Sequence, residues 1–155
     1  MAHTHEPADY DCPFCDFDPD REPEVVYRDD RVFATVCPRW WPRNPGHLLI
    51  IPNAHHENIY NLPAADGHAV FDVTQRLARA MRTAYDCAGV TTRQQNEPAG
   101  GQTVWHFHQH LFPRYPDDDF YATPPHPTPL PAPTRRTYAT RIRAALSGQG
   151  SPAGD

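Results

Sequence analysis

Three histidines stand at alternate positions in the stretch Val-Trp-His-Phe-His-Gln-His-Leu-Phe-Pro-Arg, which covers residues 104–114. Side chains alternate between the two faces of an extended strand, so His106, His108 and His110 would project from one side, about 6.6–6.8 Å apart. Neutral imidazoles in this arrangement could attack a phosphorus atom or converge on a zinc ion. A solvated face that happens to be rich in histidine is the third interpretation.

The segment directly before the histidines favours the phosphate. It reads Asn-Glu-Pro-Ala-Gly-Gly-Gln-Thr over residues 96–103. A turn that contains glycine lets backbone N–H groups approach an anion closely. Gln102 and Thr103 add neutral hydrogen-bond donors, for which a plain zinc cage would have no use.

Periodic apolar patterns predict the elements that must position these residues. Hydrophobic runs indicate strands at 24–28, 32–37, 47–52, 91–96 and 104–113. Pro63 and Gly89 bracket a helix with an apolar stripe of helical period, and a second, short helix is expected at 135–146. These elements predict an α+β fold, a mainly antiparallel five-stranded sheet with one long helix packed on it and a short C-terminal helix.

Composition limits the class of protein. A chain of 155 residues with 39 % hydrophobic and 21 % charged residues suits one soluble domain. The net charge of −5 argues against a nucleic-acid partner, and no apolar run is long enough to span a membrane. The N-terminus has no signal-peptide pattern, so we expect a cytoplasmic protein. We expect three parts: an N-terminal zinc-binding segment (1–23), a central domain (24–120) and a proline-rich C-terminal extension with a short helix (121–155).

Two motifs resemble those of the histidine-triad (HIT) superfamily of nucleotide hydrolases and transferases. Gly101-Gln-Thr-Val-Trp-His-Phe-His-Gln-His-Leu-Phe-Pro-Arg114 is similar to its signature, and Pro45-Gly46-His47 followed by Leu-Leu-Ile-Ile-Pro52 is similar to its second motif. The resemblance covers roughly residues 12–120. It implies a HIT-like fold and an enzyme that cleaves the α-phosphate bond of a nucleotide conjugate and releases a nucleoside monophosphate.

The resemblance also assigns roles to residues. It implies that His108 is the nucleophile, which forms a covalent nucleotidyl-histidine, while His110 and Gln102 hydrogen-bond the phosphate oxygens. This chemistry requires no metal ion. The substrate-binding positions that it implies are Asn96, Gly101, Thr103 and, at the edge of the pocket, His47.

One position departs from the family pattern. Many members carry Asp or Asn seven residues before the glycine of the second motif, and Arg39 occupies that place here. Arg39 or Arg43 could meet a distal phosphate or carboxylate. Trp40 and Trp41 could form a wall for stacking or simply pack the loop.

The pair Cys12 and Cys15 has three interpretations: a redox dithiol, inert thiols or half of a zinc site. A redox dithiol would need a preceding strand and a following helix, which the flanking residues do not predict. Related bacterial proteins use two such cysteines and two histidines, and the resemblance places the latter at His55 and His106. We therefore expect a structural Zn²⁺ on these four residues, with His56 as a substitute for His55.

The resemblance implies a nucleotide as the small-molecule partner and a homodimer as the assembly. The base and the leaving group are left open. A weakly catalytic or non-catalytic nucleotide-binding protein with a regulatory role is the alternative function.

Overall fold

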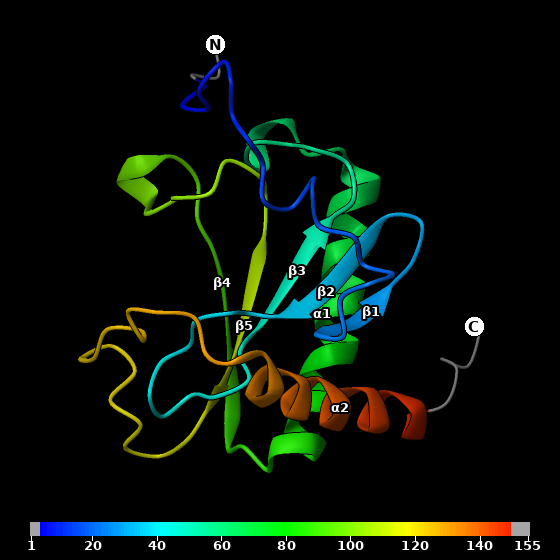
Figure 1. The fold of residues 1–155 in the computed structure, drawn as a ribbon, viewed down its shortest axis with the longest axis vertical. Coiled ribbons are helices and arrows are strands. Elements are labelled where there is room, and N and C mark those ends of the chain that lie inside the picture. Colours follow the sequence, from blue (N-terminus) through cyan, green and yellow to red (C-terminus); the bar gives the residue numbers. More distant parts are fainter. Residues whose placement is uncertain (1–3, 150–155) are drawn as a thin grey trace.

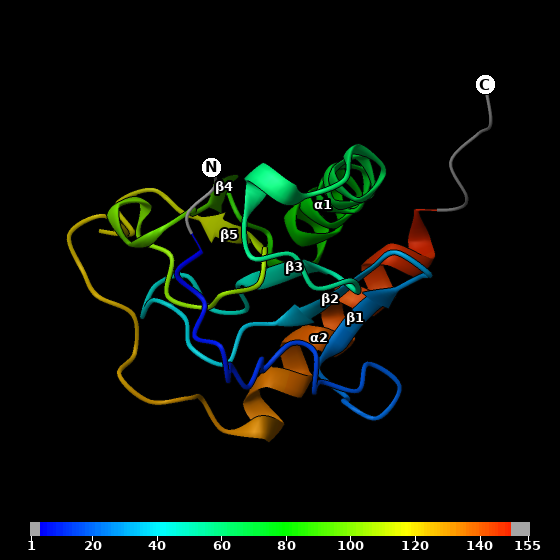
Figure 2. The ribbon, with the colours of Figure 1, turned by 90° about the horizontal axis from the view of Figure 1, so that it is seen from above.

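The computed structural model describes residues 4–149, which form a five-stranded antiparallel sheet with two helices (Figure 1). The strands are β1 (Val25–Arg28), β2 (Val32–Val36), β3 (Leu48–Pro52), β4 (Gly89–Gln94) and β5 (Gln109–Arg114), in the spatial order β1-β2-β3-β5-β4. Helix α1 (Ala64–Tyr85) covers one face of the sheet, as Figure 2 shows, and α2 (Ala132–Gly148) contacts α1, β1 and β2. The predicted fold class is confirmed.

The two faces of the sheet bury different partners. On the α1 face, Leu48, Ile50 and Leu111 are fully buried against the helices in the main core. On the opposite face, a smaller cluster of Phe33, Leu49 and Ile51 is covered by Phe14 and Phe17 of the N-terminal segment. Strand register places His110 beside Leu49, which puts this histidine on the face away from α1.

The predicted hairpin at 24–37 is confirmed, and its turn is held by one carboxylate. Asp29 Oδ1 accepts hydrogen bonds from the backbone N–H groups of Arg31 and Val32. Strands β1 and β2 then pair in antiparallel register.

Helix α1 ends earlier than the sequence predicted. It stops at Tyr85 because Asp86 adopts a left-handed conformation with φ of 51°, which an aspartate tolerates better than most residues. Gly89, the predicted end of the helix, is the first residue of β4. The predicted stripe is otherwise buried, as Val70, Val73, Leu77 and Met81 show.

The last strand begins later than predicted, which changes the geometry of the histidines. β3 pairs with β5 only between Leu48–Ile50 and Gln109–Leu111, and residues 104–108 form a bend instead of a strand. The bend bonds to the loop after β3, with Phe107 N–H donating to the His56 carbonyl over 2.6 Å. The prediction that all three histidines share one strand face is therefore wrong, because only His110 lies in a strand.

Two short 3-10 helices, Ile59–Asn61 and Pro98–Gly100, lie before α1 and before β5. Helix α2 is longer than the predicted 135–146, and its Ala139 and Ile142 are fully buried in the main core. Residues 150–155 of the expected C-terminal extension lie outside the described part. Within residues 4–149, neither helix is both long and apolar enough to cross a membrane.

Helix α2 also covers the β1 edge of the sheet. Arg143 Nη1 donates to the carbonyls of Pro23 and Val25 at 2.9 and 2.8 Å. Buried Glu24 lies 3.6 Å from Arg135 and 3.9 Å from Arg136. This edge of the sheet thus has side-chain donors on its free carbonyls.

Candidate functional site

His108 is held in one tautomer by the backbone. Its Nδ1 lies 2.7 Å from the carbonyl oxygen of His106, and a carbonyl can only accept, so Nδ1 carries the proton. The other nitrogen, Nε2, then carries a lone pair, and no group within residues 4–149 hydrogen-bonds it. Burial lowers the pKa of His108, although the bond to His106 opposes this shift. The ring is therefore neutral at pH 7, as a nucleophile must be.

His110 and His47 form a second pair of neutral rings. His110 Nδ1 lies 2.8 Å from His47 Nε2, and both rings lie against Phe112. Burial lowers the pKa of His47 to about 3 and that of His110 well below its ordinary value, and the nearby charge of Arg93 acts in the same direction. The ring centroids of His108 and His110 are 4.9 Å apart, so the structure brings these three histidines together.

The loop before the histidines is tied up internally. The backbone N–H groups of Gly100, Gly101 and Gln102 all donate to carbonyls within the same turn. The buried Gln102 side chain donates to the carbonyls of Glu57 and Val104 and accepts from the N–H of Glu97. The predicted cradle of free backbone N–H groups is thus wrong for these three residues, because the turn closes on itself.

The remaining positions expected in substrate binding lie in different settings. Asn96 Oδ1 accepts from the N–H of Ile59 at 2.8 Å and so braces the loop before α1. Thr103 is exposed directly beside the buried Gln102. Arg39 is also exposed, and no hydrogen bond or ion pair with the rest of residues 4–149 holds its guanidinium. Trp40 is buried against Tyr138, which favours loop packing for this tryptophan.

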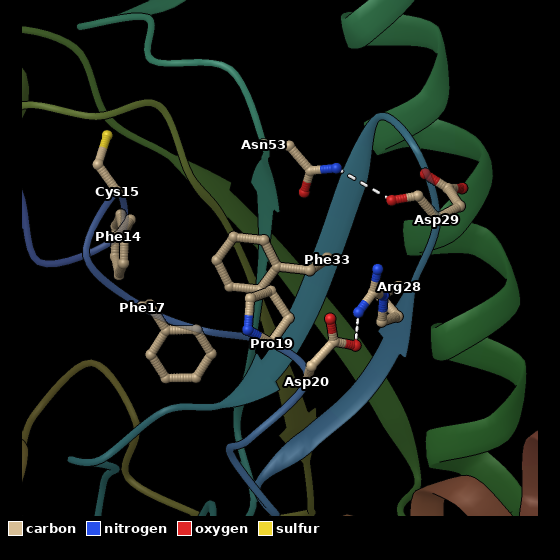
Figure 3. A pocket seen from close by; sticks show the side chains of 9 residues that line it. All are labelled: Phe14, Cys15, Phe17, Pro19, Asp20, Arg28, Asp29, Phe33 and Asn53. Atoms are coloured by element: carbon tan, nitrogen blue, oxygen red, sulfur yellow. Dashed lines mark hydrogen bonds and ion pairs between the residues drawn. The ribbon is translucent and has the colours of Figure 1, made fainter.

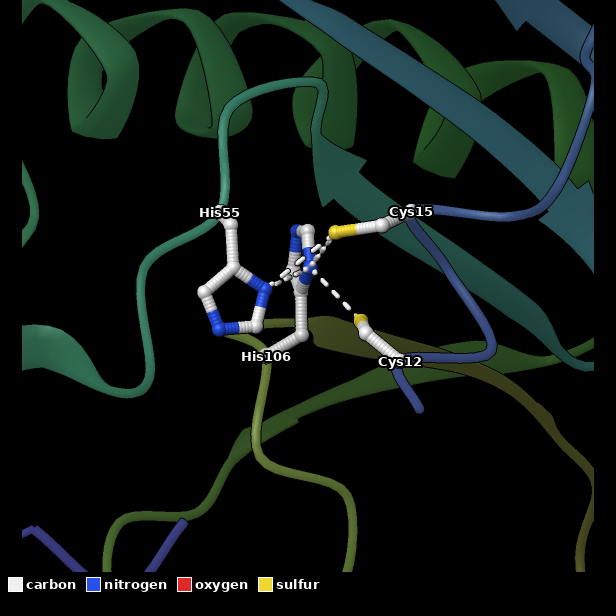
Figure 4. Close-up of side chains that lie close together, drawn as sticks. All are labelled: Cys12, Cys15, His55 and His106. Carbon is white, nitrogen blue, oxygen red and sulfur yellow. Dashed lines mark hydrogen bonds between the residues drawn. The ribbon is translucent and has the colours of Figure 1, made fainter. Parts of the chain in front are cut away.

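The four residues expected to bind zinc converge at one point, which Figure 4 shows. Their ligand atoms all lie within 4.8 Å of one another, and they come from Cys12, Cys15, His55 and His106. Cys12 Sγ and Cys15 Sγ are 3.3 and 3.6 Å from His106 Nδ1, and the two histidine Nδ1 atoms are 3.1 Å apart. These separations are close to the edges of a tetrahedron built with zinc bond lengths of about 2.0–2.3 Å.

The protonation of the two rings supports a cation at this point. His106 Nε2 donates to the carbonyl of Pro52, and His55 Nε2 donates to the carboxylate of Glu6, each over 2.9 Å. Both Nδ1 atoms are then lone pairs that face each other, an arrangement that repels unless a cation lies between them. The chemistry of this donor set fits zinc.

The redox interpretation of the two cysteines has no structural support. Between residue 4 and β1 the described chain contains no helix and no strand, whereas a redox dithiol of the thioredoxin type lies between a strand and a helix. All four cysteines of the chain are free thiols.

A cavity of about 220 Å³ lies on the face of the sheet away from α1, beside the cysteine turn (Figure 3). Phe14, Phe17, Pro19 and Phe33 supply its apolar lining. Its polar lining includes Asn53 and Asp29, which are joined by a hydrogen bond, and the ion pair of Arg28 with Asp20.

This cavity adjoins the histidines through one aromatic ring. The edge of Phe14 meets His108 at a centroid distance of 5.3 Å and His106 at 5.6 Å. The cavity was not expected from the sequence. Phe14, which stands between the two cysteines, was the signal that could have indicated it, because a zinc site there would place this ring beside the triad.

Arg93 is a second residue that the sequence analysis missed. It lies in β4 directly across from His110 in β5, and its guanidinium carbon is 5.1 Å from the ring centroid of Trp41 and 4.9 Å from that of Phe112. In the sequence it is one arginine in the short run Thr-Thr-Arg-Gln-Gln, so only the strand register reveals its neighbour.

Comparison with known proteins agrees with this geometry. Residues 19–117 match the HIT domain family. The chain is similar to Protein hit of Bacillus subtilis, with 34 % identity over 94 residues that cover 61 % of this chain and 63 % of that protein. It is also similar to the bis(5'-adenosyl)-triphosphatase of Saccharomyces cerevisiae, with 30 % identity over 93 residues that cover 59 % and 44 %. The chain thus spans less than two thirds of each relative.

A solved structure extends the comparison to the metal site. The zinc-bound histidine triad family protein of Mycobacterium smegmatis superposes with a TM-score of 0.70 and 28 % identity, over 83 % of this chain and 87 % of that one. That similar protein was solved with zinc bound. The cluster of Cys12, Cys15, His55 and His106 suggests zinc binding in this chain as well.

Proposed function

The chain belongs to the HIT domain family, and from this premise we propose that it is a nucleotide hydrolase or nucleotidyl transferase with His108 as its nucleophile. The HIT family includes hydrolases such as diadenosine triphosphatase. The observation that carries the proposal is the state of one ring: His108 has its proton fixed on Nδ1 and an unpartnered lone pair on Nε2. Such a ring is a ready nucleophile at neutral pH.

The proposed reaction has two steps. In the first, the His108 Nε2 lone pair attacks the α-phosphorus, an Nε2–P bond forms, and the bond from phosphorus to the leaving group breaks with its electron pair on the leaving group. In the second, water attacks the same phosphorus and loses a proton to the solvent, the Nε2–P bond breaks with its electron pair returning to Nε2, and the nucleoside monophosphate departs. The ring is cationic while it carries the nucleotide, and the carbonyl of His106 stabilises that charge through the Nδ1 proton. These steps use no metal ion.

The neighbouring rings can stabilise the phosphate oxygens. If His47 Nε2 donates to His110 Nδ1, the proton of His110 lies on Nε2 and can be donated to a phosphate oxygen. His47 is then a positioning residue that fixes the tautomer of His110. The side-chain amide of Gln102 stabilises the loop that precedes the histidines. Asn96, Gly101 and Thr103 remain proposed substrate-binding positions.

We place the nucleoside in the cavity beside Phe14. Its apolar lining of Phe14, Phe17 and Phe33 suits a base, and the side-chain amide of Asn53 suits ribose hydroxyls. Phe14 touches the His108 ring, so a nucleoside there would carry its 5′-phosphate to the nucleophile. Ribose recognition thus needs no carboxylate at Arg39.

We assign the four-residue cluster to a structural Zn²⁺. Four protein ligands leave no open coordination position, which is typical of structural zinc. When bound, the ion would tie residues 4–23, which contain no helix or strand, to the loop after β3 and to the bend at 104–108.

The experiment is a release assay with four nucleotide conjugates: a dinucleoside polyphosphate, an adenosine phosphoramidate, an adenylyl sulfate and a nucleotide sugar. We expect nucleoside monophosphate from at least one of them, and His108→Asn should reduce this rate at least about 10⁴-fold. The variant should still bind AMP, measured by calorimetry. Equal rates for His108→Asn and the unaltered protein would refute the assignment of His108 as the nucleophile. AMP binding without any turnover would instead favour the regulatory alternative.

We also propose a cytoplasmic homodimer. Strand β4 forms an edge of the sheet, and the neighbouring apolar cavity of about 360 Å³ between α1 and the sheet includes Phe71, of which 70 % is exposed. A second copy added at this edge would cover Phe71. Four free thiols suit a reducing compartment. Light scattering should give twice the 17.6 kDa of one chain.

A further inference from the structure

Arg93 is a cation directly beside the reactive histidines. Its strand position pairs with His110, and it shares the sheet face away from α1. Its guanidinium carbon lies 4.9 Å from the ring centroid of Phe112, on which the rings of both His47 and His110 stack. Arg93 therefore borders the site at which His108 would attack phosphorus.

The guanidinium is held in place by aromatic rings. Its central carbon lies 5.1 Å from the ring centroid of Trp41, 4.9 Å from Phe112 and 5.8 Å from Phe120. Cation–π contacts of this kind fix the position and orientation of the group while leaving its N–H donors unused. The rings thus preorganise an anion-binding fork.

The guanidinium N–H donors of Arg93 have no hydrogen-bond partner within residues 4–149. Its Nε is fully buried without a hydrogen bond, a costly state for a charged group that calls for an explanation. Two other arginines, Arg43 and Arg114, differ in this respect. Arg43 pairs with Asp119 at 3.1 Å and Arg114 with Asp118 at 2.7 Å, whereas no carboxylate within residues 4–149 pairs with Arg93.

The order of strands puts Arg93 and the proposed nucleoside cavity on opposite sides of the nucleophile. The cavity is lined by Phe33 of β2 and Arg28 of β1, while Arg93 lies in β4. Between them runs β5, which directly follows His108 and carries His110. A substrate with its nucleoside over β2 would extend its leaving group over β4.

We propose that Arg93 binds an anionic group on the leaving-group side, so that the preferred substrates are nucleotide conjugates with a negatively charged leaving group. This inference rests on the proposed function, because it takes His108 as the point of attack. A bidentate contact of the two Nη groups of Arg93 with a phosphate or sulfate would give the guanidinium an anionic partner and hold the leaving group as charge builds on it. Conjugates that release an amine would gain nothing from Arg93.

The test compares two substrates that share AMP and differ in the leaving group: diadenosine triphosphate, which releases ADP, and adenosine 5′-phosphoramidate, which releases ammonia. In Arg93→Gln, kcat/KM should fall about tenfold to hundredfold for the anhydride, the usual effect of losing a charge-assisted contact. For the phosphoramidate it should change less than about threefold. Arg93→Lys, which keeps the charge but not the fork, should lie between.

The matched control is Arg79→Gln, which removes the same charge from the exposed surface of α1 on the other face of the sheet. It should change neither rate. Equal losses for both substrates in Arg93→Gln, or no loss for either, would overturn the inference, and thermal melting shows whether the variant is folded.

A binding measurement separates this inference from the proposed function. Trp41 lies against the guanidinium, so inorganic pyrophosphate bound to Arg93 should change the tryptophan fluorescence of the unaltered protein and not of Arg93→Gln. If the unaltered protein cleaves neither substrate, the proposed function fails, and the pyrophosphate titration alone decides the anion site. Identical pyrophosphate titrations of the unaltered protein and Arg93→Gln would then refute the anion site at Arg93.

Discussion

His106 and His110 lie two residues to either side of His108, but their ring nitrogens have opposite partners. His106 donates from Nε2 to Pro52 and turns the lone pair of Nδ1 toward the two cysteines. His110 contacts His47 through Nδ1 and has Nε2 available on the side of the proposed phosphate. The residue type is the same, and the partner of one nitrogen decides whether the ring is suited to a metal or to a substrate.

The largest effect, on thermal stability, should come from disrupting the proposed zinc site. Removal of zinc with a chelator, or the change Cys12→Ser, should lower the melting temperature by about 10–20 °C, because metal-binding free energy contributes directly to folding. Thermal melting with and without added Zn²⁺ measures this. Cys37→Ala, which alters a cysteine outside the cluster, should respond to chelation like the unaltered protein. A chelated protein that melts unchanged would contradict the zinc assignment.

A smaller effect, on the reaction rate, is expected from a change to His110 on the substrate side. His110→Gln should reduce kcat about 10²–10³-fold, the usual loss when one donor to a transition-state oxygen is removed. Its melting temperature should stay within a few degrees of the unaltered protein, since no metal depends on this ring. Parallel losses of stability in His110→Gln and Cys12→Ser would remove the distinction between the two histidines.

A further effect concerns the dependence of stability on pH. The pKa of His47 is about 3 in the folded protein, against about 6.5 for an ordinary histidine, so the unfolded chain binds this proton first as the pH falls. The free energy of unfolding should therefore decrease by up to about 1.4 kcal/mol per pH unit between pH 6.5 and 3, with no contribution above this window.

His47→Gln should remove that part of the acid sensitivity. Urea unfolding at pH 7, 6 and 5 measures the slope for both proteins. An identical slope in the variant would show that His47 is not kept neutral by burial.

The sequence predicted the strands and helices better than the conformation of the segments that connect them. The apolar runs at 32–37 and 47–52 correspond to β2 and β3, because buried strands leave a continuous hydrophobic signal. The alternation of His106, His108 and His110 was misleading, since it also fits a strand at 104–113, of which only residues 109–113 are extended in β5. The bend at 104–108 depends on hydrogen bonds to His56 and Pro52, which are distant in sequence.

The residues of the candidate site also divide into those that the sequence predicted and those that it did not. Cys12, Cys15, His55 and His106 were expected together from a family resemblance, and their ligand atoms do converge. Arg93 and the ring of Phe33 were not expected, because their relation to the histidines arises from strand pairing and from sheet faces. No local pattern encodes the residue that stands opposite His110 across a ladder.

The arginine that caps the β1 edge limits how the sheet can grow. With Arg143 occupying the carbonyls of Pro23 and Val25, β4 is the one edge among the described strands at which another chain can add its backbone. In the proposed homodimer, a twofold axis that joined two such edges would use up both, so that dimer would close at two copies and would not extend into a filament.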